Sequence, residues 1–224
     1  MEGKIWQLRG SFVLLHHRTI SPGTHCLYNM LLINDTFDAL TAEDVERIVA
    51  TFPLWRQTYT QRLKHFRNRR ESAAAFALLQ RGLQEHYGIG DFEFAYSEGG
   101  KPSLAGHPEI HFNISHCSAA AACAISRHAV GVDVERLGRY SERLARYTMN
   151  DDELAAILAA SADDGERDLL FTRLWTQKEA VAKLTGEGIS TNVRQLLQHP
   201  STYRLTTSVN QEKGYVVTMA SFQP

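Results

Sequence analysis

Hydrophobic and polar residues along the chain predict helices followed by strands, and then the same order of elements again. Residues 41–44 (TAED) have the sequence of a helix start, with the threonine hydroxyl available to cap free backbone amides. This short helix should end near residues 52–53, and residues 57–87 favour one long helix or two helices joined near Gly82. Residues 88–90 (GIG) should end the helical region.

Alternation of polar and apolar residues, loose at residues 5–15 and with a period of two at 91–96 and 109–114, predicts three strands. Two further strands are expected at residues 119–126 and 130–134. Residues 99–102 (GGKP) should form the turn between the second and third of these strands. The last two strands should pair as a hairpin.

The second half repeats this order, with helices predicted at residues 151–160 and 166–184 and strands at 203–209 and 215–221. The halves are not alike in sequence, but the shared order indicates an α+β fold of two subdomains. We expect the division at residues 1–108 and 109–224, with the linking segment near residues 105–115 and the metal site in the second subdomain.

The composition is that of an ordinary globular protein. Hydrophobic residues make up 43% of the 224 residues, enough to supply a core for one large domain or two small ones. Lys and Arg total 24 against 25 Asp and Glu, so the net charge of −1 gives no reason to expect nucleic acid or an anionic membrane as partner. The N-terminal residues lack the apolar stretch of a signal peptide, so we expect the three cysteines to be reduced thiols in the cytoplasm.

Asp133 and Glu135 are candidate ligands for a divalent cation. In a strand, residues two apart face the same side, so both carboxylates would share one face while Val132 and Val134 point into a core. Magnesium prefers oxygen ligands and commonly keeps phosphate oxygens beside one or two carboxylates, so a third acid would complete the protein's share. The alternative is that the two acids only cover an exposed face of a sheet.

The predicted helix that begins near Glu166 carries a third carboxylate, Glu179. Glu179 and Lys183 are four residues apart and lie just beyond the edge of the apolar arc of the helix, at the rim of a cleft. An ion pair on the helix surface is an alternative explanation for these two residues. Lys178 points into the apolar arc, so its ammonium group must be paired with a phosphate or a carboxylate, or must extend to solvent.

Two segments are candidates for binding phosphate. Residues 113–117 (NISHC) follow a predicted strand, so backbone amides, the Ser115 hydroxyl and the His116 ring could hold an anion together. Lys101 lies in the rigid turn of residues 100–102, although a lysine in a turn is commonly only solvated.

The basic residues from Arg62 to Arg70 surround much of the predicted helix, which argues against a helix that reads a nucleic-acid groove. Cys117 and Cys123 lack the close spacing of a structural zinc site, so no transition-metal site built from histidines and cysteines is expected. There is no Walker loop, nucleophile elbow or dinucleotide fingerprint.

Four segments in order resemble the 4′-phosphopantetheinyl transferases of the surfactin-synthetase-activating type: residues 100–102 (GKP), 112–116 (FNISH), 131–135 (GVDVE) and 175–180 (WTQKEA). The resemblance covers roughly residues 55–190 and is specific because all four segments keep their order and spacing. It implies a pseudo-twofold monomer of two similar α+β subdomains, each with antiparallel strands packed on a long helix.

The resemblance also implies a reaction, in which 4′-phosphopantetheine moves from coenzyme A to a serine of an apo acyl or peptidyl carrier protein and leaves 3′,5′-ADP. The implied ligands of Mg²⁺, with Mn²⁺ as an alternative, are Asp133, Glu135 and Glu179. The residues implied to bind coenzyme A are Arg62, Lys101, Ser115, His116, Asp133 and Lys183. Glu179 is our hypothesis for the general base, and Lys183 is expected to stabilise charge in the transition state.

The chain departs from this family at a few positions. Cys117 stands where the family often repeats serine, and Ala74 and Ala75 stand where relatives place a basic or hydroxyl residue against the nucleotide. Arg69 or Arg70 could substitute there. Two alternatives to a transferase are a non-catalytic module that binds a carrier protein or a nucleotide, and a magnesium-dependent phosphohydrolase.

Overall fold

The computed structural model describes residues 17–18, 28–161, 164–188, 193–198 and 200–223. The strand predicted at residues 5–15 lies outside these residues. The first half contains β1 (His17–Arg18), β2 (Tyr28–Asn34), a 3₁₀ turn η1 (Phe37–Ala39), α1 (Ala42–Val49), α2 (Leu54–Gln61) and α3 (Phe66–Tyr87). Four strands follow, which are β3 (Phe94–Tyr96), β4 (Pro102–Leu104), β5 (His111–His116) and β6 (Ala121–Ser126).

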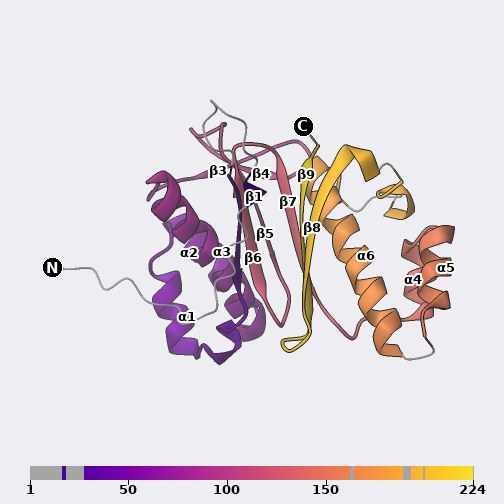
Figure 1. The fold of residues 1–224 in the computed structure, drawn as a ribbon. Coiled ribbons are helices and arrows are strands. Elements are labelled where there is room, and N and C mark those ends of the chain that lie inside the picture. Colours follow the sequence, from indigo (N-terminus) through magenta and orange to yellow (C-terminus); the bar gives the residue numbers. More distant parts are fainter. Residues whose placement is uncertain (1–16, 19–27, 162–163, 189–192, 199, 224) are drawn as a thin grey trace.

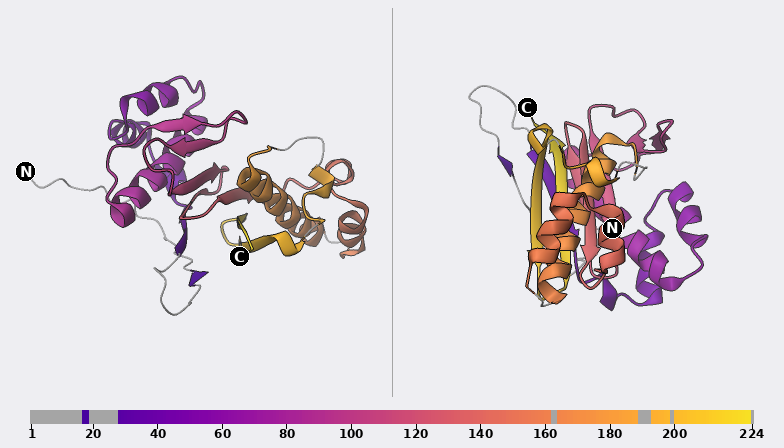
Figure 2. Two further views of the ribbon diagram at one scale, coloured as in Figure 1. Left: turned by 90° about the horizontal axis from the view of Figure 1, so that it is seen from above. Right: turned by 90° about the vertical axis from the view of Figure 1, so that its right-hand side faces the viewer.

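The second half contains β7 (Val130–Arg136), α4 (Glu142–Thr148), α5 (Asp151–Ala159), α6 (Asp164–Thr185), the 3₁₀ turns η2 (Val193–Gln195) and η3 (Pro200–Thr202), β8 (Tyr203–Asn210) and β9 (Tyr215–Phe222). Both helices and both strands predicted after residue 150 are confirmed. The elements form layers, with α1 to α3 on one side, the strands in the middle and α4 to α6 on the other side (Figures 1 and 2). Within the described residues, no helix combines the length and apolar composition that crossing a bilayer requires.

The first helix begins where the sequence predicts. Thr41 Oγ1 accepts a hydrogen bond from the backbone N of Asp44 at 3.2 Å, and the Asp44 carboxylate accepts one from the backbone N of Thr41 at 3.0 Å. This reciprocal capping satisfies backbone donors that have no partner inside the helix.

The predicted join near Gly82 is wrong, because α3 runs through this residue without interruption. The helical region divides instead at residues 62–65, between α2 and α3. A Cβ atom at Gly82 would lie 2.5 Å from Ile125 Cδ1 and 2.8 Å from Leu32 Cδ1. The glycine therefore serves the close approach of α3 to the sheet rather than a break in the helix.

The strands form two larger antiparallel sheets, with orders β1-β2-β6-β5 and β7-β9-β8, and a separate pair of β3 with β4. The predicted hairpin of residues 119–126 and 130–134 is wrong, because β6 pairs with β2 and β5, whereas β7 pairs with β9. On the β5 side of β7, the backbone N–H groups of Val132 and Val134 donate to side-chain oxygens of Asn113 and Ser115. Side chains of β5 thus take the place of a continuous backbone ladder. The turn of residues 99–102 joins β3 to β4, a strand that the sequence pattern did not predict.

Each larger sheet packs on one long helix, as expected from the resemblance: α3 contacts β2, β5 and β6, and α6 contacts β7, β8 and β9. The pseudo-twofold relation between the halves stays a prediction. The expected division between residues 108 and 109 falls before β5, whose hydrogen bonds go to β6 and the first sheet. We therefore propose that residues 127–129, between β6 and β7, are the better place for a subdomain boundary.

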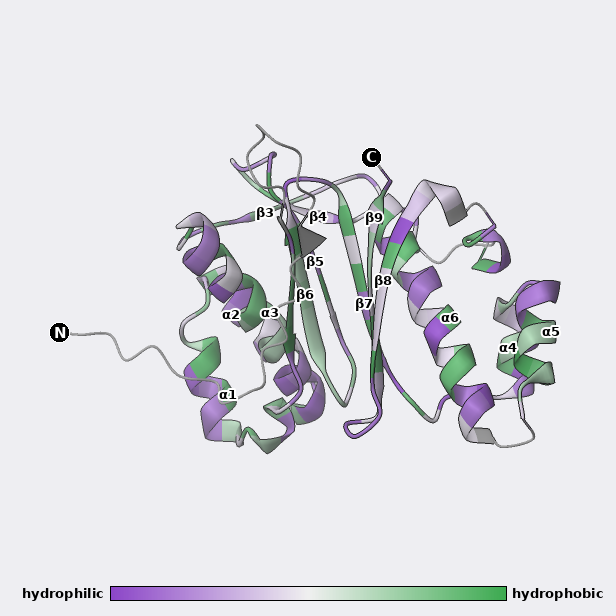
Figure 3. Cartoon of the chain, viewed as in Figure 1, coloured by the Kyte–Doolittle hydropathy of each residue, from purple (hydrophilic) through white to green (hydrophobic). Residues whose placement is uncertain are grey.

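The two larger sheets share an apolar layer, to which β2 contributes Leu31 and Ile33, and β6 contributes Ala122 and Ala124. Residues that alternate with them in the same strands pack against α3 instead. The alanines are small, so β7 and β9 can lie close to the first sheet. Figure 3 shows hydrophobic colour along these central strands and both colours on the helices.

Gly131 sets how closely α6 approaches β7. A Cβ atom at this position would lie 2.5 Å from the backbone N of Leu184 and nearer still to the carbonyl oxygen of Ala180. Both are backbone atoms of α6, which cannot move without displacing the whole helix. Glycine is therefore the residue that allows this contact, and the contact brings the last turns of α6 against β7.

We expect Gly131→Ala to lower the free energy of unfolding by about 3 kcal/mol, because an added methyl group in a tight contact forces the helix away from the strand. Denaturant unfolding of the purified variant measures this effect. Gly90→Ala is the control, since a Cβ there would meet only the flexible end of Gln84, and we expect a change within about 0.5 kcal/mol. Equal effects of the two substitutions would contradict this account of Gly131.

Candidate functional site

Three side chains from β5, β7 and α6 meet in one hydrogen-bonded triangle. Asp133 Oδ1 accepts hydrogen bonds from Ser115 Oγ at 2.9 Å and from Lys183 Nζ at 2.6 Å. Lys183 Nζ also donates to Ser115 Oγ at 3.0 Å. The sequence predicted all three as site residues, and the fold brings them together from positions as far as 68 residues apart.

The alternation of β7 places Val132 and Val134 in the core, as predicted. Asp133 is only 3% exposed, so it does not lie on an exposed face of the sheet. The Glu135 side chain is 15% exposed, and its carboxylate accepts hydrogen bonds from Arg139 at 2.7 Å and from Trp175 Nε1 at 3.3 Å. The two acids thus have different surroundings, although they belong to the same strand.

Glu179 lies one helical turn before Lys183, close enough to Asp133 and Glu135 for their negative charges to act on it. Burial raises the pKa of Glu179 to about 7, and the negative charges of Asp133 and Glu135 act in the same direction. Lys183 and Arg139 oppose this rise. Glu179 therefore changes its protonation state near neutral pH while the protein carries no cation at this position.

The donor set of these acids fits a hard divalent cation. Asp133 Oδ2 is buried and has no hydrogen-bond partner, which leaves one oxygen open to a ligand. The repulsion that raises the pKa of Glu179 is the kind that a cation relieves. Across the part of the chain that the structure describes, however, no three acidic, histidine or cysteine side chains are gathered closely enough to hold a metal ion. The assignment of the three acids as ligands therefore stays a prediction.

Beside the triangle lies a cavity of about 260 Å³, lined by Arg56, Tyr59, Ser72, Ala75, Ile114, Ser115, His116 and Lys183. Arg56 was not predicted from the sequence. Its guanidinium donates to Ser72 Oγ at 2.7 Å and to the Ser72 carbonyl oxygen at 3.1 Å, and lies 4.6 Å from the ring centre of Tyr59. The cationic groups of Arg56 and Lys183, with the His116 ring also in the lining, suit this cavity to an anion.

His116 lies between this cavity and Glu71 of helix α3. Its Nδ1 is 3.3 Å from Glu71 Oε2. Burial lowers the pKa of His116, whereas the charge of Glu71 opposes this shift. Glu71 was also missed, although it is the one acid in the basic run of residues 67–71 (RNRRE), and that position was a usable signal.

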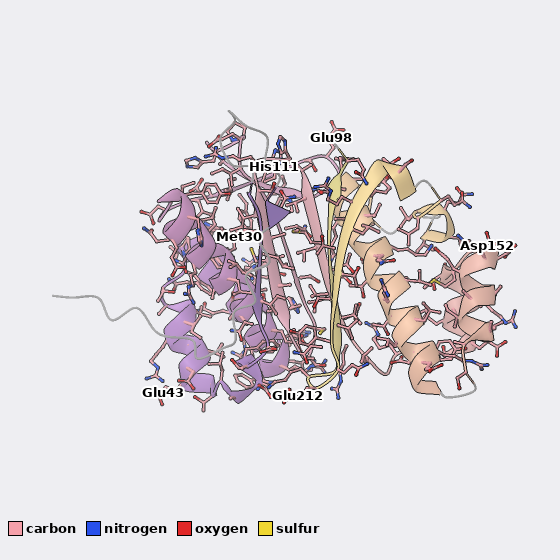
Figure 4. The ribbon with its side chains drawn as sticks, viewed as in Figure 1. Met30, Glu43, Glu98, His111, Asp152 and Glu212 are labelled. Atoms are coloured by element: carbon pink, nitrogen blue, oxygen red, sulfur yellow. The ribbon has the colours of Figure 1, made fainter. Side chains whose placement is uncertain are left out.

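Lys101 does not line the cavity of His116. Its Nζ donates to the carbonyl oxygen of Leu184 at 2.8 Å, which joins the turn between β3 and β4 to the end of α6. Lys101 lines a second cavity of about 910 Å³, together with residues that include Glu98, His111 and Thr185. Glu98 and His111 are labelled at this end of the molecule in Figure 4. Burial lowers the pKa of Lys101, so an anion in this cavity would also stabilise its charge.

The other predicted basic residues lie elsewhere. Arg62 is exposed at the C-terminal end of α2 and does not line either cavity. Arg69 lines a different cavity, between α1 and α2, and Arg70 donates to the carbonyl oxygen of Asp38 at 2.5 Å. Arg69 and Arg70 thus do not compensate for Ala74 and Ala75. In the cavity that His116 lines, it is Ser72 of α3 that supplies a hydroxyl group.

Lys178 has a structural role. The prediction that it must be paired is confirmed, because its fully buried Nζ lies 2.9 Å from Glu153 Oε2 and donates to the carbonyl oxygen of Val193 at 2.9 Å. Glu153 also caps the start of α5. The pair fastens α5 and the segment after α6 to the helix that carries Glu179.

The chain is similar in sequence to known proteins. Residues 129–220 match the family model of the 4′-phosphopantetheinyl transferase superfamily. The chain is 28% identical to 4′-phosphopantetheinyl transferase Sfp of Bacillus subtilis over 153 residues, which cover 67% of each chain. It is 34% identical to 4′-phosphopantetheinyl transferase HetI of a Nostoc species over 131 residues, 55% of this chain and 54% of the relative. It is 36% identical to 4′-phosphopantetheinyl transferase gsp of Aneurinibacillus migulanus over 96 residues, 43% of this chain and 39% of the relative.

In EDTA, the stability of the protein should depend on pH through Glu179. Folding raises the pKa of the Glu179 carboxyl group from 4.5 to about 7. This shift contributes stability that is fully present below pH 4.5 and is lost as the pH rises through 7. We therefore expect Glu179→Gln to raise the melting temperature relative to the parent by about 3 °C at pH 8, with a smaller difference at pH 5.

Scanning calorimetry at both pH values measures the difference. Magnesium should stabilise the parent more than Glu179→Gln, since the variant has lost one negative charge. Glu187→Gln, at an exposed position beyond the end of α6, is the control and should follow the parent. A constant difference between parent and Glu179→Gln at all pH values would contradict the assignment of the titration to Glu179.

Proposed function

The chain belongs to the 4′-phosphopantetheinyl transferase superfamily and is an enzyme of this class, and from this premise we propose the details of its reaction. The 4′-phosphopantetheine group moves from coenzyme A to a serine of an apo acyl or peptidyl carrier protein, in a magnesium-dependent step. The products are the holo carrier protein and 3′,5′-ADP. We also propose that the enzyme is a cytoplasmic monomer, without nucleic acid or a membrane as partner.

The observation that carries this proposal is the direct contact between an acidic group and a cationic cavity. Lys183 bonds to Asp133 on one side and lines the cavity with Arg56 and His116 on the other. A diphosphate that enters the cavity therefore lies beside carboxylates suited to a divalent cation. A purely structural ion pair would have no need of the adjoining anion site.

Asp133, Glu135 and Glu179 would hold Mg²⁺, or Mn²⁺ in its place, and the bound ion would supply charge neutralisation on the diphosphate. The protein's own groups do the rest. Glu179 takes the proton from the carrier serine, because it is one of the three acids beside the diphosphate and lies one helical turn from Lys183. The serine oxygen forms a bond to the β-phosphorus while the bond from this phosphorus to 3′,5′-ADP breaks. Lys183 stabilises the negative charge that develops on the phosphoryl oxygens.

The remaining groups bind the nucleotide. His116, Ser115 and Arg56 hold phosphate groups from the smaller cavity, and Lys101 acts from the larger one. Both cavities border β5 and the end of α6, which supports one extended ligand that spans them. Arg62 contributes from the exposed end of α2.

The decisive experiment combines the protein with coenzyme A, magnesium and a set of apo carrier proteins, followed by intact mass of the carrier. We expect a mass gain of one phosphopantetheinyl group. Asp133→Ala should lower the rate by at least about a thousandfold with the fold retained, because it removes a ligand of the ion and the partner of Lys183. Full activity of this variant at saturating magnesium would contradict the ligand assignment. Release of phosphopantetheine without any carrier would instead support a phosphohydrolase, and binding without transfer would support a non-catalytic module.

Arg56 in α2 and Arg62, the residue directly after α2, should differ in their effect on coenzyme A binding. We expect Arg56→Gln to raise KM for coenzyme A about 30-fold, because it removes a buried charge from the cavity. Arg62→Gln should raise KM only about twofold, because an exposed charge is screened by solvent. Steady-state kinetics at one carrier concentration compares the two variants, and a larger effect at Arg62 would reverse the assignment.

A further inference from the structure

Glu71 is a buried carboxylate directly behind a cavity that suits anions. Its side chain is 8% exposed. One oxygen accepts a hydrogen bond from Arg67 Nε at 2.8 Å, and the other lies 3.3 Å from His116 Nδ1. A negative charge at this place repels a phosphate, so the carboxylate must serve the cavity in some other way.

The geometry determines which nitrogen of His116 holds the proton. A neutral imidazole has one N–H group, and a carboxylate beside Nδ1 holds the proton on that atom. Nε2 is then the nitrogen left for the cavity, and it carries a lone pair. A lone pair cannot donate a hydrogen bond to a phosphate until Nε2 takes up a second proton.

The charges around His116 decide how readily it takes that proton. Lys183 from α6 and Arg56 from α2 act against it, as does burial of the ring. Glu71 from α3 acts in favour of it. In the free protein the balance lowers the pKa of His116, so the ring is neutral above neutral pH. A phosphate beside Nε2 adds the negative charge that reverses this balance.

We propose that Glu71 is a positioning residue that holds one proton on Nδ1 of His116, so that Nε2 takes a second proton from solvent when a phosphate group binds. His116 then donates to the phosphate as a doubly protonated ring. Glu71, which faces Nδ1 on the other side of the ring, stabilises the ring's positive charge. Ligand binding is thereby coupled to uptake of a proton. This inference rests on the proposed function, because it assumes a phosphate ligand in this cavity.

The test is calorimetric titration with adenosine 3′,5′-bisphosphate at pH 8, in two buffers of different ionisation enthalpy. At this pH the phosphates of the ligand are already fully ionised, so proton uptake belongs to the protein. We expect uptake of about one proton by the parent protein and less than half of that by Glu71→Gln. The variant should bind about tenfold more weakly at pH 8, as expected for one charge-assisted interaction, with a smaller difference at pH 6.

Glu85→Gln is the matched control, because Glu85 pairs with Arg81 on the same helix with the same spacing, at 2.7 Å, as Glu71 with Arg67. It should leave both the affinity and the proton uptake unchanged. Tighter binding of Glu71→Gln at both pH values would overturn the proposal, since Glu71 would then act only by repulsion.

A measurement without ligand separates this inference from the proposed function. Nitrogen-15 chemical shifts of His116 in the free protein at pH 8 should show the proton on Nδ1. A proton on Nε2 would overturn the positioning role, whatever the ligand. Failure of the parent to bind the bisphosphate or coenzyme A would contradict the proposed function, while the free-protein spectrum would still test Glu71.

Discussion

Helix α6 lies against strand β7 through backbone contact at Gly131, and the geometry of the site depends on this distance. The contact places the turn of α6 that carries Lys183 within hydrogen-bonding reach of Asp133. A larger residue at position 131 would push these elements apart and so strain the hydrogen bond between Lys183 and Asp133. One missing side chain therefore decides whether the acids and the lysine act together.

The first half of the protein joins this centre through the side chains of β5. Ser115 and Asn113 accept hydrogen bonds from the backbone of β7, so the two larger sheets meet through side chains rather than through a shared backbone ladder. This junction leaves room for a cavity that borders both halves. Carboxylates on one side of the junction and cations on the other give two neighbouring sites of opposite charge, and Lys183 belongs to both.

Local features of the fold were predictable because they depend on neighbouring residues. The capping of α1 follows from residues 41–44, and the burial of Val132 and Val134 follows from alternation within one strand. The pairing of strands was not predictable in the same way, since β6 and β7 are adjacent in sequence but lie in different sheets. The role of Gly82 was also misjudged. A glycine that allows close packing of a helix against a distant strand cannot be told, in the sequence, from a glycine that interrupts the helix.

The family resemblance, the acids of β7 and α6, and the burial of Lys178 could all be predicted before the fold was known, because strand and helix periodicities determine which residues share a face. Which cations reach the cavity depends on the folded arrangement. Arg56 enters it and Arg62 does not, although both lie at the same helix. Glu71 stands behind His116 because α3 packs beside β5. Such contacts depend on how whole elements are oriented against each other, and this orientation results from packing over the entire core.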